Sequence, residues 1–255
     1  MGAPEVSGYL RGLALLALAA IVLAWSAGAT VLNRGALLHI VQAQCLPHWR
    51  TQHDPAPCLQ VSLPDAGGER GGYVVLPDRK GGAHFLLIPT RQLSGIESPE
   101  LLDAGTTNYF DAAWHARRQV EQLLGKAVPR ETIGLAINPR RSRGQDQLHI
   151  HIECLGSAIQ AQLKALTWPD DDQWHLVKLG RLSYQARRID GENLEQSSPF
   201  RLVAQGLPGA RMNMGPYTLL VAGWRFTDGP GFILLADSAA PGSETLLDSA
   251  CLVAR

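Results

Sequence analysis

Two histidines stand two residues apart in a stretch whose side chains alternate between polar and apolar. The stretch runs from Gln147 to Cys154 and reads QLHIHIEC. Such an alternation is typical of a β-strand with one buried face. His149, His151 and Glu153 are therefore expected on the same polar face, with the Cα atoms of the two histidines roughly 6.6 Å apart.

Two imidazoles at this spacing support two kinds of chemistry. One histidine could act as a nucleophile while its neighbour handles a proton or the charge of a phosphate. Alternatively, His149, His151 and Glu153 could bind a metal ion, in a metal-dependent hydrolase or a metal-binding periplasmic protein. The simplest alternative is a solvated strand face that carries two histidines without a function.

A basic turn precedes the histidine stretch. Residues 133–137 are apolar and predict a second short strand, and the turn that follows contains Arg140, Arg141 and Arg143. Because a guanidinium group pairs with phosphate through two parallel hydrogen bonds, these arginines indicate an anionic ligand. The alternative for them is a solvated loop.

The stretch resembles the histidine-triad motif, His-φ-His-φ-His-φ-φ with φ apolar, of nucleotide hydrolases and transferases. The resemblance places Gln147 at the first histidine, His149 at the middle one and His151 at the third. It implies that His149 attacks an α-phosphorus and becomes transiently nucleotidylated, that His151 contacts the scissile phosphate, and that Gln147 helps to orient the site. Asn138 and Gln145 match an Asn and a Gln that lie near the ribose and phosphates in that family.

A more specific resemblance, to bacterial CDP-diacylglycerol pyrophosphatases, covers nearly the whole chain. It rests on the order of an N-terminal apolar segment, the histidine stretch and several short motifs: CLP at 45–47, YVVL at 73–76, LLIPT at 86–90, ESP at 97–99 and SPF at 198–200. It implies hydrolysis of the diphosphate of CDP-diacylglycerol to CMP and phosphatidate through a nucleotidyl-histidine intermediate, in phospholipid metabolism. It also implies a lipid substrate met at the membrane, with no metal and no other cofactor. An anchored domain that only binds nucleotide or lipid is a further hypothesis.

The N-terminal segment predicts a membrane anchor. Residues 13–32 carry no charge, and twenty residues of helix span about 30 Å, the thickness of a bilayer's hydrocarbon core. We expect residues 1–33 to be a single-pass anchor in the inner membrane and residues 34–255 to be a periplasmic domain. A cleaved signal peptide is the alternative, since residues 27–29 (AGA) resemble a cleavage site.

The chain contains four cysteines, as expected of a protein in an oxidising compartment. Cys45 and Cys58 would close a short local loop, which leaves Cys154 to pair with Cys251. Four free thiols are the alternative. The formal net charge is zero, and it gives no reason to expect a nucleic-acid partner.

The remaining pattern predicts an α+β fold, an antiparallel sheet with helices packed on one face. Residues 73–76 and 84–89 read as a hairpin, and apolar residues at helical spacing predict a helix over about 107–124. Residues 217–235 echo 73–88, with a Tyr-led strand, a turn with Gly and a Phe-Leu strand. We therefore expect two similar histidine-triad-like halves, of which only the first keeps the histidines.

Overall fold

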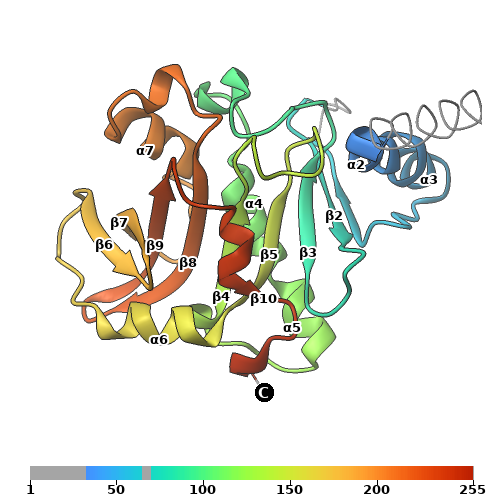
Figure 1. The fold of residues 1–255 in the computed structure, drawn as a ribbon. Coiled ribbons are helices and arrows are strands. Elements are labelled where there is room, and N and C mark those ends of the chain that lie inside the picture. Colours follow the sequence, from blue (N-terminus) through green and yellow to red (C-terminus); the bar gives the residue numbers. More distant parts are fainter. Residues whose placement is uncertain (1–32, 65–69, 255) are drawn as a thin grey trace, which may run out of the picture.

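The computed structural model describes residues 33–64 and 70–254, and this part of the chain has an α+β fold built on one large antiparallel sheet (Figure 1). The strand order is β1-β2-β3-β5-β4-β8-β9-β7-β6, with β10 paired beside β5. Among the described residues, no helix has the length and apolar character needed to cross a bilayer. The anchor predicted over residues 13–32 lies outside the described residues.

The first half of the sheet holds the histidine stretch. Its strands are β1 (Gln60–Ser62), β2 (Tyr73–Pro77), β3 (Phe85–Pro89), β4 (Ile133–Ile137) and β5 (Ile150–Leu155). The predicted hairpin is β2–β3, which pairs Tyr73 with Pro89 and Pro77 with Phe85. The predicted long helix is divided at Arg117 into α4 (Tyr109–Ala116) and α5 (Arg118–Leu124). Asn108 caps the start of α4 by accepting a hydrogen bond from the Asp111 amide.

The second half repeats this arrangement of hairpin, helix and hairpin. It contains β6 (His175–Leu179), β7 (Leu182–Asp190), α7 (Pro199–Gly206), β8 (Thr218–Phe226) and β9 (Gly229–Asp237). The order β6-β7-β9-β8 matches β2-β3-β5-β4, and the halves join where β4 pairs with β8. The predicted correspondence was misplaced, because residues 217–235 occupy the positions of β4 and β5 and not those of β2 and β3.

Helices cover both faces of the sheet, which corrects the expectation of a single covered face. On one face α4, α5 and α7 pack on Ile150 and Ile152 of β5 and on their neighbours. On the opposite face α6 (Ser157–Ala165) contributes Leu163 to a cluster that contains Leu155, and Figure 1 shows α4 and α6 on opposite sides of the sheet. The physical reason is that central strands such as β4 are buried along their whole length, so both of their faces need an apolar cover.

The N-terminal helices also lie on the face opposite α4. They are α2 (Ala36–Ile40), the π-helical turn η2 (Val41–Cys45) and α3 (Leu46–Gln52), and they pack on Val74, Leu76, Leu86 and Ile88. The remaining short elements are η1 (Asn33–Gly35), η3 (Pro99–Leu102), η4 (Arg130–Thr132), η5 (Ala210–Met212), η6 (Ser243–Leu246), β10 (Leu247–Asp248) and η7 (Leu252–Ala254).

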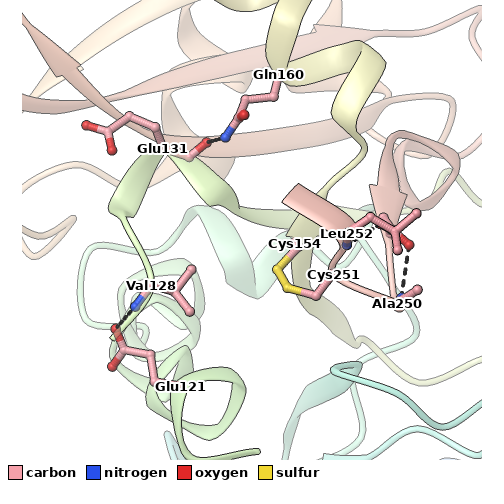
Figure 2. Close-up of a disulfide and its surroundings, with 9 residues drawn as sticks. Glu121, Val128, Glu131, Cys154, Gln160, Ala250, Cys251 and Leu252 are labelled. Carbon is pink, nitrogen blue, oxygen red and sulfur yellow. Dashed lines mark hydrogen bonds between the residues drawn. A yellow bond between two sulfur atoms is a disulfide. The ribbon is translucent and has the colours of Figure 1, made fainter. Parts of the chain in front are cut away.

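Two disulfides connect the ends of the described chain to the sheet. Cys45 is joined to Cys58, with Cα atoms 5.6 Å apart, and this links the N-terminal helices to the segment before β1. Cys154 is joined to Cys251, with Cα atoms 5.1 Å apart, and Figure 2 shows this bond between β5 and the C-terminal tail. The pairs are those expected from the sequence.

Candidate functional site

The two histidines lie at the start of β5, on the face opposite α4. β5 begins at Ile150, so its pairing with the neighbouring strands starts three residues later than the alternation predicted. Within the strand, Ile150 and Ile152 point into the core under α4, while His151 and Glu153 point to the other face. The rings of His149 and His151 meet edge to face, with their centroids 5.0 Å apart.

Gln147 is buried, but its side chain does not orient the histidines. Its amide nitrogen donates to the carbonyl oxygens of Pro89 at 3.0 Å and Arg91 at 2.9 Å, and its Oε1 accepts from the Leu93 amide at 3.2 Å. These bonds hold the loop after β3. The predicted alternation of faces does not extend to Gln147, because this residue precedes the first paired residue of β5. Its side chain therefore points toward the loop after β3.

The main chain of Gln147 orients His149 instead. His149 Nδ1 lies 2.7 Å from the Gln147 carbonyl oxygen. Since a carbonyl oxygen only accepts, Nδ1 carries the proton and Nε2 keeps its lone pair. Burial lowers the pKa of His149, which favours the neutral ring. The ring lines a pocket of about 170 Å³ with Leu37, Ile40 and Gln145, between α2 and the β2–β3 hairpin.

His151 has different partners. Its Nδ1 lies 2.9 Å from His84 Nε2, and the same His84 nitrogen lies 3.0 Å from Glu153 Oε1. Its Nε2 faces Glu244 Oε2 at 3.6 Å. Burial, followed by the neighbouring His149 and despite the Glu244 carboxylate, lowers the pKa of His151 well below its usual value.

Asn138 connects to this site through Glu244. Its side-chain nitrogen donates to Glu244 Oε2 at 2.9 Å, and the Glu244 amide donates back to Asn138 Oδ1 at 3.3 Å. Lys80 forms an ion pair with the other carboxylate oxygen. Burial acts to raise the pKa of Glu244, but His151, Lys80 and Asn138 together lower that pKa to about 2, so this carboxyl is ionised at neutral pH.

The arginines of the basic turn have partners away from the histidines. Arg143 is buried between Glu97, at 2.6 Å, and Asp146, at 3.2 Å. Arg141 donates to the carbonyl oxygens of Pro216, Ser238 and Ala240. Arg140 is exposed and lines a separate cavity of about 490 Å³ with Asn213.

Of the residues predicted for the site, the structure therefore brings His149, His151, Asn138 and Gln145 together. The guanidinium groups of Arg141 and Arg143 contact carbonyl groups and carboxylates of the protein, and Arg140 lines a separate cavity. Gln147 contributes its carbonyl oxygen, and its side chain has a structural role.

The sequence prediction missed Lys80 and Glu244, and nothing in the spacing selected His84 as a partner of His151. Lys80 belongs to the β2–β3 turn, where Gly82 has a φ of +72° and a Cβ would come within 2.4 Å of the Ser249 carbonyl oxygen. The paired glycines were read only as a turn signal. Glu244 lies 93 residues beyond His151 in an ordinary polar segment, and nothing local in the sequence connects the two.

Fold and site together define a class. A buried pair of histidines at the start of a central strand, one of them beside a pocket, carries the groups that nucleophilic or proton-transfer catalysis uses.

Comparison with known proteins identifies the family. The family model for CDP-diacylglycerol pyrophosphatase matches residues 32–255. A relative from Yersinia pestis named "CDP-diacylglycerol pyrophosphatase" is 41% identical over 229 residues, which cover 87% of this chain and 85% of the relative. The chain belongs to the CDP-diacylglycerol pyrophosphatase family. This confirms the resemblance seen in the sequence and the prediction of an enzyme.

The position of Asn138 gives a testable prediction. A Cβ added at Gly242 would come within 2.1 Å of Asn138 Oδ1, so Gly242→Ala must displace the amide that binds Glu244. We expect the hydrolysis rate to fall by about 10²-fold, because displacements near 1 Å in a catalytic site have effects of this size. Gly105→Ala is the control, since nothing lies within 4 Å of its Cβ. Equal rates for the two variants would show that the Asn138–Glu244 contact does not support catalysis.

Proposed function

We propose that this protein hydrolyses the diphosphate bond of CDP-diacylglycerol to CMP and phosphatidate, in phospholipid metabolism. The substrate is supported by the family and by the name of the Yersinia pestis relative. The chemistry rests on one structural observation. His149 Nδ1 is hydrogen-bonded to a carbonyl oxygen, so Nε2 keeps the lone pair needed for attack.

The proposed reaction has two steps. His149 Nε2 attacks the α-phosphorus of the CMP moiety, a P–N bond forms, and the P–O bond to phosphatidate breaks with its electron pair going to the leaving phosphate. Water then attacks the same phosphorus and the P–N bond breaks with its electron pair returning to Nε2. The water releases a proton to solvent, CMP leaves and the imidazole is again neutral. The hydrogen bond from Nδ1 to Gln147 supports the first step, because it can strengthen as the ring gains positive charge.

His151 is proposed to stabilise charge on the phosphates and to exchange a proton with the leaving group. It is suited to this role because Glu244 lies beyond its Nε2 and His84 beyond its Nδ1. Lys80, whose ammonium group forms an ion pair with Glu244 at the edge of the site, is proposed to add to this stabilisation. The proposal needs no metal and no other cofactor for these steps.

The ligand set of the alternative, a metal-dependent hydrolase built on His149, His151 and Glu153, is not the one that converges. The His, Cys, Asp and Glu groups that come close enough to share an ion in the described residues are His84, His151 and Glu153. His149 is held instead by the Gln147 carbonyl oxygen. Nucleophilic attack by His149 is therefore the function favoured for this ring.

The nucleophile can be identified by substitution and trapping. We expect His149→Ala to lower kcat by about 10⁴-fold or more, as for other deleted nucleophiles, and His151→Ala by about 10²–10³-fold, as for one lost transition-state donor. Glu153→Gln should lower kcat only slightly. Rapid quench with substrate labelled in the CMP moiety should trap a CMP–protein adduct in the wild type and none in His149→Ala. An adduct that persists in His149→Ala and disappears in His151→Ala would assign the nucleophile to His151.

The acid limb of the pH profile should lie below the ordinary histidine pKa of about 6.5. Attack needs neutral His149, and burial lowers the pKa of this ring, so the reactive form persists to lower pH. We therefore expect the acid limb of kcat/KM to be centred below pH 6.5. Tryptophan fluorescence at each pH controls for unfolding. An acid limb centred at or above 6.5 would contradict a neutral buried nucleophile.

We also propose that residues 13–32 anchor the protein in the inner membrane with the hydrolase domain in the periplasm. The support is the uncharged length of this segment, together with two disulfides in the domain that need an oxidising compartment. Protease added to spheroplasts should digest the domain, and a protected domain would contradict this orientation. A mature protein that starts near Thr30 would exclude the retained anchor.

A further inference from the structure

We infer that His84, His151 and Glu153 form a binding site for one divalent cation of the zinc class. The three residues come from two neighbouring strands. His84 directly precedes β3, and His151 and Glu153 alternate along β5, which pairs with β3 at Leu86. The inference does not depend on the proposed reaction, because it rests on a different set of atoms from the free nitrogen of His149.

The ligand atoms are close enough to share one ion. His84 Nε2 lies 2.9 Å from His151 Nδ1 and 3.0 Å from Glu153 Oε1, and one ligand atom from each residue falls within 4.8 Å of the others. In a tetrahedral zinc site with bonds of about 2.0–2.1 Å, the ligand atoms lie roughly 3.3 Å apart. Small rotations of these side chains would therefore be enough to surround an ion.

Without a cation the three groups are poorly satisfied. His84 Nε2 has at most one proton to donate, yet it faces both a ring nitrogen and a carboxylate oxygen. Of the three proposed ligand atoms, Glu153 Oε1 is buried and has no partner with hydrogen-bond geometry. All three side chains are at least 95% buried, where unsatisfied polar groups are costly.

Coordination would also place the outer nitrogens correctly. If His84 Nε2 and His151 Nδ1 coordinated an ion, each ring would carry its proton on the other nitrogen. Those nitrogens face carboxylates: His84 Nδ1 lies 3.7 Å from Asp78 Oδ1, and His151 Nε2 lies 3.6 Å from Glu244 Oε2. Histidines that bind metals in proteins typically donate their second N–H to a carboxylate, and here the two carboxylates lie just beyond hydrogen-bond distance.

The donor set selects the class of ion, and a neighbouring pocket gives it a route. Two imidazoles and one carboxylate favour zinc-class cations over magnesium and calcium, which prefer oxygen ligands. His84 and Glu153 line a pocket of about 360 Å³ together with Lys80, Glu244 and Ser249. This pocket leaves room for a water molecule or an anion as the fourth ligand.

The test is a zinc titration of the full-length, tag-free protein in detergent, after removal of metal with EDTA. Isothermal titration calorimetry should show one Zn²⁺ per chain and no comparable binding of Mg²⁺. His84→Ala and the isosteric Glu153→Gln should each weaken zinc binding by about 100-fold or more, since changes even to outer-shell partners cost 10–100-fold. Substitution with Co²⁺ should give a tetrahedral absorption spectrum that both variants lose.

Two control variants separate this site from other histidines. His175→Ala removes an exposed histidine paired with Asp171, and His149→Ala removes the ring bonded to Gln147. Both should bind zinc as the wild type does. No stoichiometric zinc binding by the wild type, or unchanged binding by Glu153→Gln, would overturn the inference. A loss of binding in His149→Ala equal to that in His84→Ala would assign the ion to a different ligand set.

Discussion

The hydrogen bond from His149 Nδ1 to the carbonyl oxygen of Gln147 determines which nitrogen of this ring carries the proton. It is possible only because the chain joins the sheet at Ile150, which leaves the Gln147 carbonyl free of the β-ladder. The Gln147 side chain keeps the chain in that position by binding the loop after β3 with three hydrogen bonds. One residue therefore supplies both the acceptor that fixes the tautomer and the anchor that holds the acceptor in place.

The two histidines are chemically different although they are neighbours on one face. His149 has one main-chain partner and a pocket, whereas His151 lies among His84, Glu153 and Glu244. Two influences on the pKa of His151 oppose each other: burial lowers it, and the Glu244 carboxylate raises it. The proposed proton exchange and the proposed cation site therefore both involve His151, whereas the His149 ring contacts neither His84 nor Glu153 through a hydrogen bond.

The sequence was sufficient where a local pattern determines the structure. The period-two alternation from Ile150 to Glu153, the β2–β3 hairpin and the apolar stripe of α4 and α5 follow from local periodicity, and the structure contains all three. The site was predictable only in part. Contacts of His151 with His84 and Glu244 span 67 and 93 residues, and no local rule indicates which distant polar residue a strand will meet. A guanidinium group likewise indicates an anion but not whether that anion is a ligand or a carboxylate of the protein, and Arg143 contacts Glu97.

The repeated topology explains why a single site lies in so large a sheet. β9 occupies the place of β5 in the second half, yet on the face where β5 carries its histidines β9 presents Ile233 and Leu235, which are buried with Leu163 of α6 and its neighbours. Those apolar side chains extend the core across the junction between β4 and β8. The second half thus stabilises the sheet on which the histidines stand, because a wide sheet buries the strands at its centre from both faces.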